Sequence, residues 1–309
     1  MRNKSKDRTK KGLLIGIIFV LFFIGLFFLN VNYNKQMFVD ASKKNLQVLA
    51  DEKALQVNEF LGFQENRLSV LSSLSVFRDV VNDPYNAEKI KLAKDMINEI
   101  KDKIPGIGVL TKEGIIIVAE NNPAGTDYSM LPGFPADDSM GIIFTRYYDQ
   151  QRKKDYYDIG GPIYDSVNKS KVIGVIAYDV ELDKISSIMK DNLDTNTSEV
   201  YLIDGNKLLL SGSKYIGQDN KNGVLIQEVN SDGAETCLDD LKKYTKNGIV
   251  EEHEGNVSKY INYMGDEVYG AHAYAPAIGG CVMAEELVDG FSKYPMSGYI
   301  ANIFKKEVK

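Results

Sequence analysis

A run of seventeen consecutive apolar or glycine residues, Leu13–Leu29, constrains this chain more than any other feature. A helix needs roughly 20 such residues to cross the hydrocarbon core of a bilayer, so the run predicts a transmembrane anchor over residues 12–30. Six Lys or Arg side chains and one acidic residue precede it, which is typical of a cytoplasmic flank. A cleaved signal peptide is the alternative, but the polar Asn30–Tyr33 does not resemble a cleavage site. We expect residues 1–11 in the cytoplasm and the bulk of the chain in the extracellular space or periplasm.

Charge and cysteine content limit the partners of the external part. The first 30 residues hold six basic and one acidic side chain, so residues 31–309 carry a formal charge of about −11, against −6 for the whole chain. Nucleic acids select basic surfaces and are not expected as partners. Cys237 and Cys281 leave two interpretations open, namely one disulfide outside the membrane or two buried free thiols.

No catalytic constellation is recognisable in the sequence. The two histidines, His253 and His272, are too few and too widely spaced for a zinc site. Neither a phosphate-binding G-x-x-x-x-G-K loop nor a G-x-S-x-G nucleophile elbow occurs. We therefore expect no enzymatic activity, no metal and no cofactor.

A long proline-free segment follows the predicted anchor. Residues 34–81 contain one glycine, and their apolar side chains recur at helical spacing, which predicts one helix. About 45 residues at 1.5 Å each give a length of about 70 Å. Asp83-Pro84 ends this helix, and a second, amphipathic helix is expected over 86–104. Residues 31–104 thus form a stalk that is also a spine for whatever packs on it.

Beyond residue 105 the sequence consists of short β-type runs separated by turns. We expect a five-stranded sheet in a distal module over 105–190, and a repeat of this plan in a proximal module over 191–290, named by their distance from the anchor. A short helix over 182–189 joins them, and a tail over 291–309 follows. The expected distal strands are Gly108–Leu110, Ile115–Ala119, Ile142–Tyr148, Tyr156–Tyr164 and Val172–Val180. The expected proximal strands are Val200–Asp204, Lys207–Ser211, Val257–Met264, Glu267–Ala275 and Cys281–Glu285.

The two modules align with each other. The alignment pairs IGVLTKEGIIIVAENNPAGTDYS with VYLIDGNKLLLSGSKYIGQDN, and places Leu110 against Leu202 and Gly125 against Gly217, each 92 residues apart. The closing strands VIGVIAYDVEL and IGGCVMAEEL also correspond. The sequence therefore predicts two copies of one α/β unit on one long helix.

These elements, in this order, resemble a double Cache domain, the extracellular PAS-like sensor of chemoreceptors, sensor histidine kinases and diguanylate cyclases. The resemblance covers about residues 34–290. It is carried by EKALQVNEFLGFQENRLSVLSSL, the G-x-D-x-S of Gly125–Ser129, GVIAYDVEL, KYINYMGDEVYGAHAYAP and GGCVMAEE. It implies an α+β fold in which a transmembrane helix and a long stalk helix precede two PAS-like antiparallel-sheet modules in tandem.

The resemblance also implies a ligand site in the distal module. In the family, the aspartate of a G-V-x-x-x-D strand contacts the ligand, and it matches Asp179. We expect Arg146, Tyr148, Tyr157 and Tyr164 to share one sheet face with it, because alternate residues of a strand point the same way. An arginine binds a carboxylate, an aspartate accepts from an ammonium group, and tyrosines supply apolar walls. The alternative is that these tyrosines pack the sheet and Arg146 pairs with Asp179.

The chain departs from the family pattern at two places. The motif R-x-W-Y is replaced by Arg146-Tyr147-Tyr148-Asp149 in a shortened segment without tryptophan, and Cys281 stands where an aromatic residue is common. The ligand is therefore expected only to be a small organic molecule of the amino-acid, amine or carboxylate class.

Two functions are compatible with the sequence. The first is small-molecule sensing, in which the ligand shifts the long helix against its partner in a homodimer. The second is a membrane-anchored structural or interaction module that binds no small ligand. A Cache receptor normally re-enters the membrane, but no apolar run after Glu286 is long enough to span it. We expect either a truncated receptor or a module that signals through a separate protein.

Overall fold

The computed structural model describes residues 3–129, 143–149, 154–191, 198–213, 224, 227–246, 249–250 and 257–288. Over residues 3–20 and 143–149 it describes the backbone alone. The predicted tail over 291–309 and His253 lie outside the described residues. Within the described part, no helix is long and apolar enough to cross a membrane.

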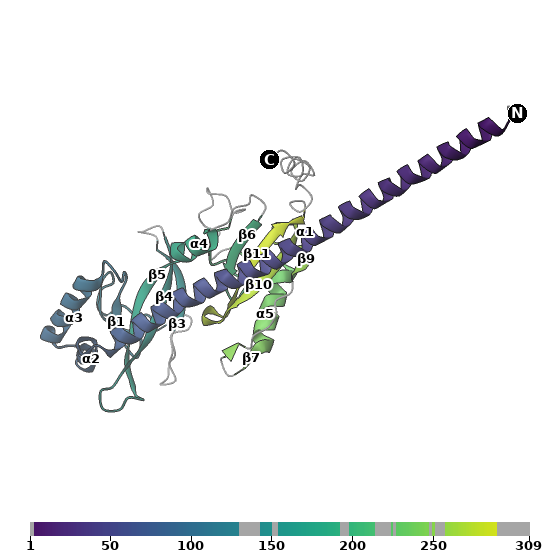
Figure 1. The fold of residues 1–309 in the computed structure, drawn as a ribbon. Helices are drawn as coiled ribbons and strands as arrows, with labels where there is room; N and C mark the ends of the chain where they lie inside the picture. The colour runs from purple at the N-terminus through teal and green to yellow at the C-terminus, as the bar shows by residue number, and fades with distance from the viewer. Residues whose placement is uncertain are drawn as a thin grey trace, which may run out of the picture.

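One helix organises the whole fold. Helix α1 (Asn3–Ser73) passes across both sheets and extends far beyond them at its N-terminal end (Figure 1). Its buried apolar residues, which include Ala50, Leu61 and Leu68, pack in one continuous core with residues of both modules. The spine predicted from the sequence is therefore confirmed.

The predicted helix over 34–81 is interrupted at Leu74. Here the backbone is extended, and α2 (Ser75–Asn82) starts in a new direction. The hydroxyl groups of Ser72 and Ser73 donate to the carbonyls of Ser69 and Val70 at 3.0 and 2.7 Å. Such bonds compete with the helical ladder, and they occur in the turn at which α1 ends.

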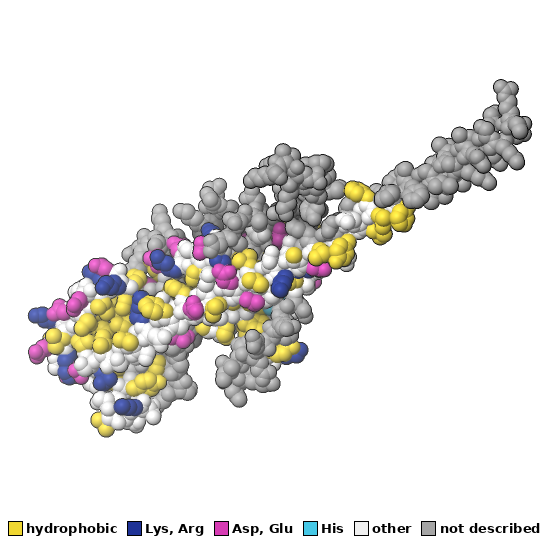
Figure 2. Space-filling view, viewed as in Figure 1, with side chains coloured by type: hydrophobic (Ala, Val, Ile, Leu, Met, Phe, Trp, Pro, Cys, Tyr) yellow, Lys and Arg dark blue, Asp and Glu magenta, His cyan; other side chains and the backbone are white. Residues whose placement is uncertain are grey.

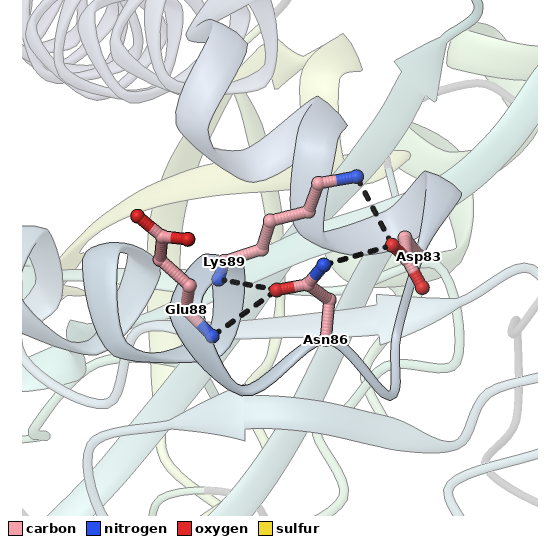
Figure 3. A network of polar contacts seen from close by, with 4 residues as sticks. All are labelled: Asp83, Asn86, Glu88 and Lys89. Atoms are coloured by element: carbon pink, nitrogen blue, oxygen red, sulfur yellow. Dashed lines mark hydrogen bonds and ion pairs between the residues drawn. The ribbon is translucent and has the colours of Figure 1, made fainter.

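Helix α3 (Ala87–Ile100) begins at a side-chain cap that Figure 3 shows. The Asn86 side chain accepts hydrogen bonds from the backbone N–H groups of Glu88 and Lys89 at 3.1 and 3.2 Å. Its own amide donates to Asp83, which also pairs with the Lys89 ammonium at 3.2 Å. This cap satisfies donors that the first turn of a helix leaves free, so α3 starts where Asp83-Pro84 ends α2.

The distal module contains the predicted five-stranded antiparallel sheet. Its order is β2-β1-β5-β4-β3. The strands are β1 (Gly108–Thr111), β2 (Ile116–Ala119), β3 (Ile143–Asp149), β4 (Lys154–Tyr164) and β5 (Val172–Glu181). Helix α1 packs closely on one face, because a Cβ atom at Gly161 would lie 2.7 Å from Leu68. On the same face, the Tyr178 hydroxyl donates to the carbonyl of Gln64 in α1 at 2.7 Å.

Helix α4 (Leu182–Lys190) leads to a four-stranded antiparallel sheet in the proximal module. Its order is β6-β11-β10-β9. The strands are β6 (Ser198–Ile203), β9 (Ser258–Ile261), β10 (Glu267–Ala275) and β11 (Gly280–Leu287), with a 3-10 turn, η1 (Pro276–Ile278), before β11. The strand predicted over 207–211 is wrong, because that segment makes only isolated bridges, Ile203–Leu209 and Leu208–Glu228.

A helix that the sequence interpretation missed covers the other face of the proximal sheet. Helix α5 (Asp232–Tyr244) packs opposite α1, and the short pair β7 (Thr245–Lys246) and β8 (Ile249–Val250) follows it. A disulfide joins Cys237 of α5 to Cys281 of β11, and both residues are fully buried. Of the two interpretations of the cysteines, the structure contains the disulfide.

Candidate functional site

Two carboxylates face each other on the side of the distal sheet that α1 leaves uncovered. The register of β4 and β5 pairs Asp158 with Asp179. Register partners in an antiparallel ladder project from the same face, with Cβ atoms about 5 Å apart. Val175 and Ala177, which alternate with Asp179 along β5, belong to a small apolar cluster that also contains Tyr128. The site thus combines two acids with an apolar floor.

The loop before β1 fixes the position of Asp179. The Asp179 N–H donates to the Pro105 carbonyl at 2.9 Å. Its carboxylate lies so close to Gly106 that a Cβ atom there would be 1.9 Å from Oδ2. Gly106 also has φ +69°, a left-handed conformation that suits glycine. The Pro105-Gly106 pair therefore serves the site as well as ending the preceding helical segment.

A third carboxylate stands behind this loop. The Gly106 N–H donates to Oε2 of Glu120 at 2.6 Å, and Glu120 is itself held by a backbone bond from its N–H to the Ile107 carbonyl at 2.9 Å. A charged acceptor makes such a hydrogen bond stronger than a neutral one does. Glu120 therefore stabilises the turn at Gly106 that contacts the Asp179 carboxylate.

The electrostatics of the site disfavour the charged forms of Asp158 and Tyr128. Burial, and then the charge of Asp179, raise the pKa of Asp158 to about 7, although part of its surface is exposed. Burial raises the pKa of the Tyr128 hydroxyl, and the charges of Asp158 and Asp179 add to the shift. Like charges at this separation disfavour ionisation of both acids, and a cation between them removes the penalty.

Among the residues that the structure describes, no group of three or more His, Cys, Asp or Glu side chains is placed to hold a metal ion. The distal site contains three acids: Asp158 and Asp179 lie on the sheet, and Glu120 contacts the backbone of the loop before β1.

The other residues predicted for the site do not all gather there. The expectation that one face holds all five is wrong for Tyr157, which pairs with Val180 and packs in the core beneath α1, opposite Asp179. Tyr164 is 40% exposed and follows an irregularity in the β4–β5 ladder. It lies six residues from Asp158 along β4, about 20 Å at the rise of a strand.

Strand β3 is described by its backbone alone. Arg146 pairs in register with Tyr157, and Tyr148 pairs with Asp155. The side chains of Arg146 and Tyr148 lie outside the described residues. By this register the two residues occupy positions of the edge strand that belong to the face of Tyr157, so the expectation that they share a face with Asp179 is not supported.

Two residues of the site were not predicted. Asp158 and Tyr156 occupy alternate positions of β4, and register pairs them with Asp179 and Glu181. The prediction of Tyr157 in place of Tyr156 is a slip of one residue, which moves a side chain to the opposite face. The available signal was Tyr156-x-Asp158, a polar alternation beside the predicted Asp179 strand.

Solved structures that are similar to this chain include sensor domains. The sensor domain of the Vibrio cholerae histidine kinase DctB superposes with a TM-score of 0.58 at 13% identity, over 80% of this chain and 98% of that one. The ligand-binding domain of the Pseudomonas aeruginosa amino acid chemoreceptor PctC, in complex with GABA, gives 0.55 at 12% identity, over 79% and 99%. That of the Campylobacter jejuni chemoreceptor Tlp3, in complex with 4-methylisoleucine, gives 0.52 at 15% identity, over 84% and 95%.

No curated protein sequence matches the chain. The Cache domain family, in its double form, matches residues 34–282, which run from α1 through both modules to the start of β11. The chain therefore belongs to the Cache domain family.

Proposed function

We propose that this protein is a non-enzymatic extracellular sensor whose distal module binds a small organic molecule carrying a protonated amino group. The observation that carries the proposal is the cross-strand pair Asp158–Asp179 on the face that α1 leaves uncovered. An ammonium group has several donors and a full positive charge, so it can satisfy both carboxylates at once. The PctC and Tlp3 domains were solved with GABA and 4-methylisoleucine, which both contain an amino group.

The proposed ligand contacts follow from this pair. Asp158 and Asp179 accept from the ammonium group, and Tyr128 lines the apolar floor beside them. Arg146 and Tyr148 of β3 are not included, because their register partners, Tyr157 and Asp155, occupy positions of β4 that alternate with Asp158 and belong to the opposite face. Tyr157 is assigned to packing between the sheet and α1, and Tyr164 to the far end of β4.

A thermal-shift screen of the full chain against amino acids, amines and carboxylates tests the proposal. We expect hits among molecules with an amino group, and their loss in Asp179→Asn. Asp95→Asn, which changes an exposed acid of α3, is the matched control and should keep every hit. No hit across such a library would instead favour a structural or interaction module, and hits confined to molecules without an amino group would reject the assigned chemistry.

We further propose that α1 anchors the chain in the membrane with its N-terminus in the cytoplasm. Leu21, Phe22, Leu26, Phe27 and Leu29 are 45–67% exposed where α1 extends beyond the modules, and Figure 2 shows this apolar surface. They belong to the uncharged run identified in the sequence, for which a bilayer is the suitable solvent. Membrane fractions extracted with carbonate should retain the chain, and release into the soluble fraction would reject the anchor.

The exposed side of α1 is also the proposed homodimer contact. Val48, Leu55, Phe63 and Val70 are 55–64% exposed and recur at intervals close to a heptad. Leu55→Glu should convert a dimer to a monomer in sedimentation experiments, whereas Glu59→Gln on the same helix should not.

The structure suggests how binding would reach α1. Strand β5, which carries Asp179, continues into α4, and the carbonyl of Asp191 at the end of α4 accepts a hydrogen bond from the Lys53 ammonium at 2.8 Å. Lys53 belongs to α1 and is fully buried. We propose that a ligand-induced shift of β5 moves α1 through this contact and is passed to a separate signalling protein.

A further inference from the structure

The proximal module contains its own pair of opposed acids. The register of β6 and β11 pairs Glu199 with Glu285. Their exposed fractions are 2% and 1%, although carboxylates are almost never fully buried unless they are paired. Glu285 alternates along β11 with Cys281 and Met283, which pack in the cluster beneath α5. The pair therefore lies on the face away from α1, as the acids of the distal module do.

Glu285 is surrounded by neutral donors. The hydroxyl groups of Tyr201 and Tyr260 both donate to its Oε1, at 2.6 and 2.8 Å, and the Asn262 amide donates to Oε2 at 3.3 Å. Across the ladder Glu199 accepts a hydrogen bond from Ser213. These contacts orient the two acids and supply no positive charge to Glu285.

On β10 and α5, which the structure describes, two further titratable groups lie on or over this face. Gly270 is the register partner of Glu285 on β10, and the next residue on that face is His272, which pairs with Met283. The His272 Nε2 lies 3.9 Å from Oδ2 of Asp240 in α5. Any positive charge on His272 is thus directed to Asp240.

The space around Glu285 is filled by its own module. A Cβ atom at Gly270 would lie 2.1 Å from the Tyr260 hydroxyl, and one at Gly233 of α5 would lie 2.3 Å from Cζ of the same ring. The disulfide between Cys237 and Cys281 holds α5 on the sheet. The Tyr260 ring therefore lies between Gly233 of α5 and Gly270 of β10, and Glu285 is only 1% exposed.

We propose that Glu285 is a proton-binding site, and that its protonation controls the packing of α5 and β9 on the proximal sheet, which makes this module responsive to external pH. Protonated Glu285 is neutral, and a proton on Oε1 can be donated to the hydroxyl oxygen of Tyr201 or Tyr260, which then accepts instead of donating. Ionised Glu285 places a second negative charge opposite Glu199 in a buried site, and water must enter beneath α5 to solvate it.

The acid–base behaviour agrees with this geometry. Burial and, to a smaller extent, the charge of Glu199 raise the pKa of Glu285 to about 7, against the hydrogen bonds from Tyr201, Tyr260 and Asn262. The folded pKa lies above the ordinary value of 4.5, so the contribution of this group to stability is fully present below about pH 4.5. It is lost as the pH rises through about 7.

The melting temperature of the full chain and of Glu285→Gln, followed from about pH 5 to pH 8.5, tests the proposal. The glutamine side chain of this variant stays neutral at every pH. The variant should match wild type near pH 5 and exceed it by about 3 °C or more near pH 8. Glu286→Gln, at the neighbouring and more exposed position, should keep a constant offset. A constant offset for Glu285→Gln as well would overturn the proposal.

Two further measurements do not depend on the folding of that variant. In an Asp158→Asn background, which removes a second acid whose pKa is about 7, infrared spectra should contain a protonated carboxyl band that disappears with a midpoint near pH 7. Tyr201→Phe, which removes a donor to the carboxylate, should raise this midpoint. Amide exchange in 232–244, corrected for its intrinsic pH dependence, should rise across the same range. Absence of the band at low pH, or exchange that ignores the transition, would reject the proton site.

Discussion

Asp158 of β4 and Asp179 of β5 are register partners on the uncovered face of the distal sheet, and the carboxylate of Asp179 rests against the backbone of Gly106. Like charges placed directly opposite across two strands destabilise a sheet. A fold that retains such a pair carries a local cost that a bound cation can offset, which is typical of a binding site. The predictions for the distal module follow from this relationship.

Removing one of the two charges should stabilise the free protein and abolish binding. Asp158→Asn keeps the shape and removes the repulsion, so we expect a higher melting temperature at pH 8 and no ligand-induced shift. The pKa of Asp158 is raised to about 7, and the stability that this group contributes is lost as the pH rises through that value. The difference in stability between variant and wild type should therefore appear near and above pH 7. Calorimetry with and without ligand measures both effects. A variant less stable than wild type at pH 8 would contradict the repulsion argument.

Ligand affinity should rise with pH, whereas the stability of the free protein should fall. An ammonium group binds ionised Asp158, and this acid has a pKa of about 7 in the free protein. Affinity measured by titration calorimetry should therefore fall about tenfold per pH unit below neutrality. Asp158→Glu alters the length of the acidic side chain, so the pH midpoint of the change in affinity should shift. A flat profile between about pH 5.5 and 8 would show that the ligand does not require the ionised acid.

Gly106→Ala should disrupt the distal site by displacing the Asp179 carboxylate. The added methyl group would overlap the Asp179 carboxylate, and alanine is strained at φ +69°. We expect a loss of about 1–3 kcal/mol in unfolding free energy and a loss of binding. Gly125→Ala is the matched control, because it shares the positive φ of +87° but has open space around it. If both variants lose stability but only Gly106→Ala loses binding, the contact with Asp179 is responsible.

Lys53→Met tests the link between the distal site and α1. Methionine keeps the apolar stem but cannot donate to the Asp191 carbonyl at the end of α4. A hydrogen bond from a charged donor is worth about 1.5–3 kcal/mol, so the melting temperature should fall. Ligand affinity should change little, while amide-exchange changes in α1 on ligand binding should disappear. Unaltered exchange changes in the variant would exclude this contact as the route.

The helices and strands were largely predictable, because the signals for them are local. Hydrophobic periodicity identified the spine, and turn residues separated all five distal strands. The break at Leu74 was not predictable, since leucine favours helices. Helix α5 was missed although Ala234, Cys237, Leu238 and Leu241 recur at helical spacing behind Ser231, whose side chain caps the first turn. The signal was present, but acidic residues between these positions obscured it.

The sites were harder to predict, because they depend on pairing between distant strands. Asp179 was identified from its strand pattern, but its partner Asp158 emerges only from the β4–β5 register. The pairing of Glu199 with Glu285 joins strands far apart in the sequence and has no local signal. The closure of the proximal module depends on Tyr260 lying over Gly270, a contact set by tertiary packing.

The disulfide should account for much of the stability of the proximal module. Cys237 and Cys281 are 44 residues apart, and closing a loop of this length in the unfolded chain corresponds to about 4 kcal/mol by chain entropy. The double variant Cys237→Ser/Cys281→Ser should lose about 2–5 kcal/mol in unfolding free energy measured with urea. Both residues are fully buried, so a thiol reductant should leave the native protein intact until the module opens. After correction for the thiolate fraction of the reductant, reduction should accelerate above neutral pH in wild type if ionised Glu285 loosens α5 as proposed, and should not accelerate in Glu285→Gln. Equal reduction rates in the two proteins at pH 8 would show that ionisation of Glu285 does not control access to the disulfide.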